Sequence, residues 1–92
     1  MLKSILLGMK IREFMYLNLF EKAEIAWGGV FIADRKDRND IVQLYLLGNF
    51  FVEVYFNFID KEIITVVPFT SSKLLEPYYT DIDISSLFTL NS

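Results

Sequence analysis

The nine residues Phe50-Phe51-Val52-Glu53-Val54-Tyr55-Phe56-Asn57-Phe58 decide the fold, because they fit a pleated strand and little else. Aromatic and β-branched side chains, which strands favour, fill the segment, and it contains neither glycine nor proline. Gly48-Asn49 precedes it and Asp60-Lys61 follows it, and another apolar run lies beyond each of these turns. We therefore expect this segment to be a middle strand of an antiparallel meander.

Three further strands are predicted on either side of this segment. Residues 30–34, 41–47 and 62–69 are short apolar runs. Pro68, near the end of the last run, suits an edge strand because proline has no N–H to donate to a neighbour. The charged run 35–40 joins the first two strands. Its charges nearly cancel, which favours a solvated hairpin connection over a phosphate-binding loop.

Helical signals precede the strands. Asn18 followed by Glu21 matches a capping box, and Gly28-Gly29 is a stop signal that can supply the left-handed residue after a helix. The helix between these signals has an apolar stripe made of Leu19, Phe20, Ala23, Ala26 and Trp27. Residues 10–17 also show helical spacing, so the sequence predicts two helical segments with a break at Asn18.

A short helix is also expected near the C-terminus, where Ser72 is placed to cap residues 73–79. A chain of 92 residues has the length of one domain. We therefore predict a single α+β domain over residues 9–92, preceded by an N-terminal extension over residues 1–8. In this domain an N-terminal helical segment packs on a four-stranded antiparallel β-meander, and the short C-terminal helix follows the sheet.

The composition indicates a surface that meets another protein. Apolar residues make up 53% of the chain, above the usual value of about 45–50%. The mean hydropathy is +0.35, which is high for a small soluble domain. Since a small domain has proportionally more surface, it cannot bury all of these side chains. Some are expected to lie on a contact surface.

Several kinds of chemistry are disfavoured by the sequence. The net charge of −3 does not suggest nucleic-acid binding, which is typical of basic domains. The chain has no histidine and no cysteine, so it lacks the commonest general base and all thiolate ligands. Two carboxylate pairs, Glu21 with Glu24 and Asp81 with Asp83, are typical of exposed surface rather than of an acid–base pair. We expect no enzyme, no catalytic residue, no cofactor and no metal.

The sequence also favours a protein that acts away from membranes. Its longest apolar runs fall well short of the ~18 residues that a transmembrane helix needs. The apolar part of the N-terminus covers only residues 5–7, which is too short for a signal peptide. We therefore expect no membrane partner and a cytoplasmic location.

The loop at Gly48-Asn49 sets which residues share a face of the sheet. A two-residue loop pairs Leu47 with Phe50 and mixes polar and apolar side chains on both faces. A three-residue loop pairs Leu47 with Phe51 instead and gathers the polar side chains on one face. We favour the three-residue loop for this reason, together with a two-residue turn at Asp60-Lys61.

This register predicts an outer face that is too apolar for water, because each large side chain left exposed loses about 1.5–3 kcal/mol relative to burial. Glu53 is its odd member: it needs a charged partner if it is buried, and otherwise is a polar spacer or a specificity contact. The predicted contact residues on this face are Tyr45, Leu47, Phe51, Glu53, Tyr55, Ile64 and Val66.

Two functions are compatible with such a face. The first is a small non-enzymatic interaction module that forms a homodimer through the outer face. The alternative is an immunity or antitoxin-like inhibitor, which would hold another protein through the same face or through its acidic tail. In both cases the partner is a protein, either a second copy or a different chain.

Three segments resemble parts of a known family. Residues 21–33 have the sequence EKAEIAWGGVFIA, and this segment is similar to the helix-then-strand opening of short uncharacterised bacterial α+β proteins. Residues 50–55 and 74–78 resemble later parts of the same proteins. The resemblance covers about residues 9–86. It implies no activity, and no catalytic residue is carried over from it.

Overall fold

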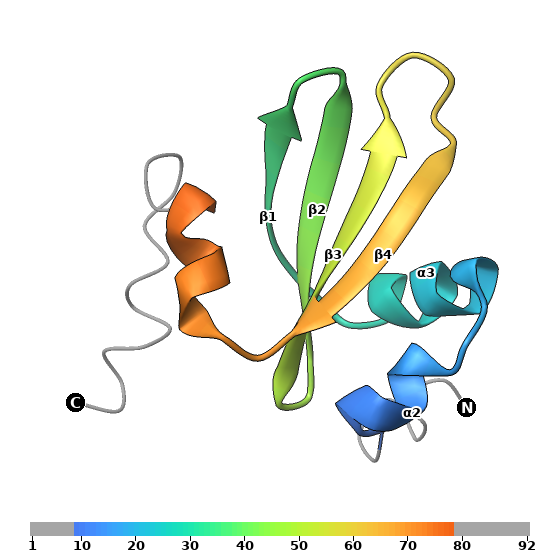
Figure 1. The fold of residues 1–92 in the computed structure, drawn as a ribbon, viewed down its shortest axis with the longest axis vertical. Coiled ribbons are helices and arrows are strands. Elements are labelled where there is room, and N and C mark those ends of the chain that lie inside the picture. The colour runs from blue at the N-terminus through green and yellow to red at the C-terminus, as the bar shows by residue number, and fades with distance from the viewer. Residues whose placement is uncertain (1–8, 79–92) are drawn as a thin grey trace.

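The computed structural model describes residues 9–78 and confirms the predicted α+β fold (Figure 1). Predictions made for residues 1–8 and for the chain from residue 79 onward, including Asp81 and Asp83, lie outside the described residues. The elements in chain order are α2 (Ile11–Met15), α3 (Leu19–Trp27), β1 (Val30–Asp37), β2 (Asp40–Leu47), β3 (Phe50–Asn57), β4 (Ile63–Phe69) and the 3-10 helix η1 (Ser72–Tyr78).

The four strands form one antiparallel sheet in the order β1-β2-β3-β4, which is the predicted meander. The helices α2 and α3 lie on one side of the sheet, and η1 lies on the other (Figure 1). We call these faces the helix side and the η1 side. No helix among residues 9–78 has both the length and the apolar character needed to cross a membrane.

The predicted register at Gly48-Asn49 is wrong. Leu47 pairs with Phe50, so the loop has two residues rather than three. Gly48 has φ 60°, the left-handed conformation at the first loop position that lets a tight hairpin follow the twist of its strands. The three-residue loop was favoured because it separated polar from apolar faces. That criterion does not apply, because helices pack against both faces of this sheet.

The predicted turn at Asp60-Lys61 is also wrong. Residues 58–62 form a wider loop, and the pairing shifts between Tyr55 and Phe56. The side chain of Asn57 explains the wider loop, because its Oδ1 accepts hydrogen bonds from the backbone N–H groups of Ile59 (2.8 Å) and Asp60 (3.1 Å). As a result, Val54 pairs with Val66 and the two side chains share the helix side.

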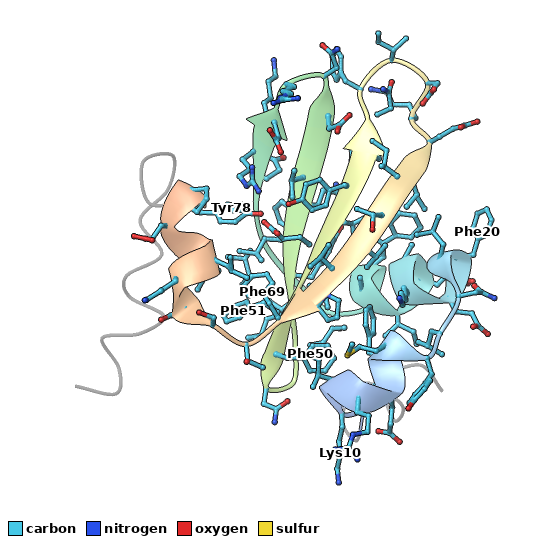
Figure 2. The ribbon with its side chains drawn as sticks, in the orientation of Figure 1. Lys10, Phe20, Phe50, Phe51, Phe69 and Tyr78 are labelled. Atoms are coloured by element: carbon cyan, nitrogen blue, oxygen red, sulfur yellow. The ribbon has the colours of Figure 1, made fainter. Side chains whose placement is uncertain are left out.

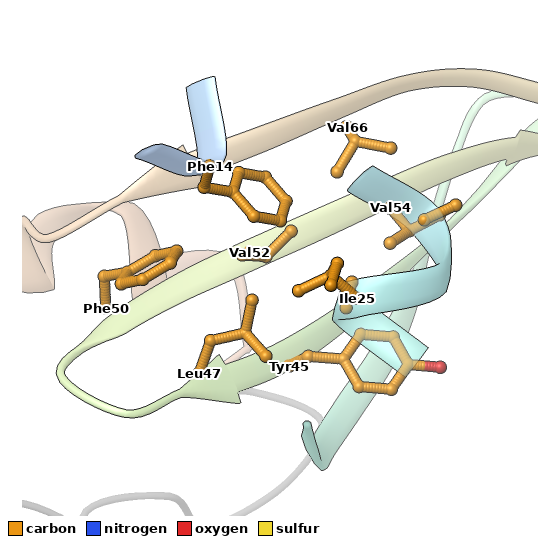
Figure 3. Close-up of a cluster of buried hydrophobic side chains, with 10 residues drawn as sticks. Phe14, Ile25, Tyr45, Leu47, Phe50, Val52, Val54 and Val66 are labelled. Carbon is orange, nitrogen blue, oxygen red and sulfur yellow. The ribbon is translucent and has the colours of Figure 1, made fainter. Parts of the chain in front are cut away.

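Two apolar cores fill the two sides of the sheet. On the helix side, the ring of Phe14 packs edge-on against Phe50 with centroids 5.7 Å apart (Figure 3). The other buried members of that core are Ala23, Ile25, Ala26, Tyr45, Leu47, Val52, Val54 and Val66. On the η1 side, Phe51 stacks on Phe69 with centroids 5.5 Å apart, beside buried Ala33, Leu44, Leu75 and Tyr78.

The capping signal at the start of α3 acts as predicted. The end of α3 and the start of η1 differ from the prediction. The capping box is present: Asn18 Oδ1 accepts from the Glu21 N–H (2.9 Å), and the Asn18 N–H donates to Glu21 Oε1 (3.0 Å). Gly28 ends α3 in a right-handed conformation, so no left-handed residue is needed there. At η1 the side chain that accepts a backbone N–H is Ser71 rather than Ser72.

Candidate interaction surface

The seven residues predicted to form one contact face lie on different parts of the sheet. Tyr45, Leu47 and Val66 belong to the buried core on the helix side (Figure 3). The other strand-paired members, Phe51, Glu53 and Tyr55, alternate with that set and face the η1 side, while Ile64 is exposed near the start of β4. The prediction that these residues share one outer face is therefore wrong, and the wrong register is its direct cause.

Glu53 is the centre of a polar cluster on the η1 side, and it is only 5% exposed. Its Oε2 accepts a hydrogen bond of 2.6 Å from the Tyr78 hydroxyl and one of 3.2 Å from Arg35 Nη2. Its Oε1 accepts from the Tyr55 hydroxyl at 3.2 Å. Glu53 is thus a buried carboxylate with a charged partner, as its burial requires. We call Arg35, Glu53, Tyr55 and Tyr78 the Glu53 cluster.

The electrostatics of the Glu53 cluster favour the protonated forms of Arg35, Tyr55 and Tyr78. Burial and then the hydrogen bond to Glu53 raise the pKa of Tyr78 far above its ordinary value. Burial, followed by the charge of Glu53, likewise raises the pKa of Tyr55. Burial alone would lower the pKa of Arg35, but its interactions with Tyr78 and Glu53 outweigh this effect and raise it.

This arrangement fastens η1 to the sheet. Tyr78 points from η1 to the sheet (Figure 2), and the guanidinium of Arg35 lies 5.3 Å from the centre of its ring. A tyrosine with a raised pKa is a hydrogen-bond donor and not a base. In addition, residues 9–78 contain no group of three side chains able to hold a metal ion.

The helix side, in contrast, is only partly covered. The nine residues of α3 span ~14 Å, whereas an eight-residue strand spans ~26 Å. Two adjoining hollows of about 310 and 430 Å³ lie beside α3 and share the side chains of Lys61 and Ile63. We call them together the α3 groove; its walls are Leu19, Phe20, Trp27, Gln43, Tyr45, Phe56, Lys61, Glu62 and Ile63.

Two aromatic side chains of α3 stand at this groove instead of in the core. Phe20 is 73% exposed and Trp27 is 49% exposed, although both were predicted to belong to the buried stripe. The residues that α3 buries are Ala23, Ile25 and Ala26. These three residues mark the side of α3 that faces the sheet, so Phe20 and Trp27 lie on its other side (Figure 2 shows Phe20 pointing outward).

Gln43 holds two aromatic side chains that line the groove. Its Oε1 accepts a hydrogen bond of 3.3 Å from Trp27 Nε1 and one of 3.1 Å from the Tyr45 hydroxyl. Both aromatic side chains are therefore held at their polar ends. A wall with fixed aromatic rings loses little conformational entropy on binding, which is favourable for a contact surface.

Charges of both signs lie along this surface, and the acidic Glu62 lines the groove next to Lys61. On the exposed side of α3 lie Glu21 and Glu24, whereas Lys36 and Lys61 lie at the hairpin ends, with Nζ atoms 5.6 and 4.4 Å from the ring centre of Phe58. In the described part of the chain, every ion pair involves Arg35. The two lysines are thus not neutralised by an ion pair within residues 9–78.

The edge of β1 is a weaker candidate for a contact. A hollow of about 770 Å³ runs along residues 31–36. However, the pairing of β1 with β2 is irregular between Phe31 and Ala33, and the edge carries the exposed charges Asp34 and Lys36. Irregularities and charges on an edge strand discourage the addition of a further strand.

One feature of the sequence points to the exposure of Phe20 and Trp27. On a helical wheel Ile25 lies opposite to Phe20, so a buried face that includes Ile25 leaves Phe20 and Trp27 outside.

Comparison of the chain with protein-family models, with curated proteins and with solved structures found no match. The candidate surface is therefore defined by its own geometry: aromatic walls, two hollows and exposed charges of both signs.

Proposed function

We propose that this protein is a small, non-enzymatic interaction module that forms a homodimer through the α3 groove. The observation that carries the proposal is the exposure of Phe20 and Trp27 beside two hollows on the partly covered helix side. Aromatic side chains in such positions are the residues that most often anchor protein interfaces. The groove replaces the outer sheet face that was expected from the sequence.

The size of the surface is compatible with this role. A standard interface buries ~800 Å² on each partner, which is about one eighth of the 6408 Å² accessible surface of this chain. From their exposed fractions, Phe20 and Trp27 alone offer roughly 250 Å². Leu19, Phe56 and Ile63 extend the apolar area along the groove. The groove thus supplies the central apolar part of an interface, and the charged residues around it supply the rim.

The proposal includes action in the cytoplasm without cofactor or metal. The chain has no cysteine, so its fold does not rely on disulfides, which small secreted domains commonly need. The titratable groups that are buried together, in the Glu53 cluster, are used to hold η1. This use supports a binding role rather than a catalytic one.

The first experiment is sedimentation velocity of the full chain from about 1 µM to about 200 µM. We expect a dimer that dissociates on dilution, and we expect Phe20→Glu to raise the dimer Kd at least about tenfold because it puts a charge into an apolar contact. Ile59→Glu is the matched control, since Ile59 is 81% exposed on a loop and does not line the groove. Circular dichroism of both variants checks that the fold is intact.

Two results would contradict the proposal. One is a wild-type chain that stays monomeric at the highest concentration, which would favour the alternative of an inhibitor that binds a different protein. The other is a Phe20→Glu variant that dimerises as well as the Ile59→Glu control, which would place the contact elsewhere on the molecule.

A further inference from the structure

We infer that the dimer is two-fold symmetric, with α3 of each copy lying along the α3 groove of the other and Glu24 of one copy opposite Lys61 of its partner. This inference rests on the proposed function and adds an arrangement and a specific charge contact to it. It follows from the presence of a protruding ring, a hollow and both signs of charge on one surface.

The first observation is the order of side chains along α3. Phe20, Glu24 and Trp27 follow one another at spacings of four and three residues, so they line the same side of the helix. Glu24 is exposed and makes no ion pair within residues 9–78. A partner that covers Phe20 and Trp27 must therefore also cover the carboxylate of Glu24.

The second observation is the position of Lys61 on the opposite wall of the groove. Lys61 lines both hollows, and its ammonium lies 4.4 Å from the ring centre of Phe58. It makes no ion pair in the described part of the chain. Glu62 lines one of the two hollows with Lys61 but makes no ion pair with it. A partner that enters the groove and supplies a carboxylate near Lys61 would pair this charge as it loses its water, which offsets the cost of burying it.

The third observation is that the groove has room for an aromatic ring such as that of Phe20, which protrudes from the same surface. The hollow between Trp27, Phe56 and Ile63 has a volume of about 310 Å³, larger than the ~150 Å³ cavity that accommodates a benzene ring. Phe20 protrudes from the same face. In the proposed arrangement, a second copy turned by 180° places its own Phe20 in this hollow and its own Glu24 beside Lys61.

Two-fold symmetry makes each of these contacts occur twice, since residue i meets residue j of the partner and j meets i. A second copy thus fills two hollows and forms two ion pairs without any residue from outside the surface. This self-complementarity of shape and charge is the reason to identify the occupant as a second copy of this chain.

The experiment is charge reversal in the full-length protein. Glu24→Lys alone and Lys61→Glu alone each create two like-charge contacts per dimer, and we expect each to raise the Kd at least about tenfold. An equimolar mixture of the two variants forms a heterodimer in which one ion pair is native and the other is reversed. We expect native mass spectrometry to show this heterodimer at near wild-type affinity, in excess over both homodimers.

A double variant with both reversals in one chain provides a second readout, and we expect it to recover the homodimer. Glu76→Lys, an exposed reversal on η1, is the matched control and leaves the wild-type Kd unchanged. Circular dichroism shows for every variant that the fold is retained.

The outcomes separate the arrangement from the proposed function. If the wild type dimerises and Phe20→Glu disrupts it, but the mixed variants form no excess of heterodimer and the double variant stays weak, the Glu24–Lys61 arrangement is overturned while the groove remains the contact. If the wild type is monomeric at all concentrations, the proposed function fails and the arrangement fails with it.

Discussion

The fastening of η1 to the sheet can be measured by removing a single oxygen atom, in the variant Tyr78→Phe. The change deletes the hydroxyl that donates a 2.6 Å hydrogen bond to Glu53 and keeps the buried ring beside Arg35. A hydrogen bond to a charged group contributes about 1.5–3 kcal/mol to stability. Because Glu53 keeps its bonds from Arg35 and Tyr55, its carboxylate is not left alone, so we expect a loss near 1.5–2 kcal/mol.

The assay is urea unfolding followed by circular dichroism at pH 7, with all variants at one protein concentration because dimerisation couples to stability. For a chain of this length the expected loss corresponds to a decrease in Tm of roughly 6–15 °C. Tyr16→Phe is the matched control, since Tyr16 is 85% exposed and should lose nothing measurable. If Tyr78→Phe lies within about 0.3 kcal/mol of this control, the hydroxyl does not hold η1 and the assignment is refuted.

The same variant has a signature in the pH dependence of stability. Burial and the hydrogen bond to Glu53 raise the pKa of Tyr78 in the folded state, whereas an unfolded tyrosine titrates near pH 10. The stabilisation is therefore fully present below about pH 10, and it is lost above that pH because only the unfolded chain releases this proton. Tyr78→Phe should reduce the slope of stability above pH 10 by up to ~1.4 kcal/mol per pH unit. An unchanged slope would contradict the raised pKa.

Three further substitutions test the packing. Phe14→Ala empties a fully buried site and should cost about 3–5 kcal/mol in urea unfolding; a loss below about 1 kcal/mol would mean that α2 does not pack as described. Gly29→Ala should cost about 1–3 kcal/mol, because the added Cβ would lie 2.5 Å from the Leu47 side chain and 2.7 Å from the Leu46 carbonyl oxygen, and a neutral effect would contradict this close approach. Arg38→Gly should stabilise by roughly 0.5–1 kcal/mol, since Arg38 has φ 62°, and a destabilisation would argue against the left-handed turn.

The elements of the fold were predictable because their signals are local. The capping box at Asn18 and Glu21 involves residues three positions apart, and β3 is recognisable from the composition of one short run. The number and order of the strands follow from the turns between them. Each of these inferences needs only neighbours in sequence, which is why the α+β meander could be derived without a structure.

The register was not predictable, because it depends on partners that are distant in sequence. A carboxylate at position 53 argued against an apolar face, yet Arg35 and Tyr78, which are 18 and 25 residues away, surround it there. Likewise, the exposed position of Phe20 depends on which side of α3 faces the sheet, and that side carries Ala23, Ile25 and Ala26. The error in register moved Tyr45, Leu47 and Val66 from the core to a supposed surface, and with them the predicted contact.

The most direct test of the central claim, that the α3 groove joins two copies of this chain, is an isotope-filtered NMR experiment on a mixture of labelled and unlabelled protein. It detects only contacts between protons of different copies. We predict intermolecular signals between the ring of Phe20 in one copy and the methyl groups of Ile63 in the other. Intermolecular signals confined to the β1 edge, at Val30 and Phe31, or no such signals at a concentration where a dimer is present, would contradict the account.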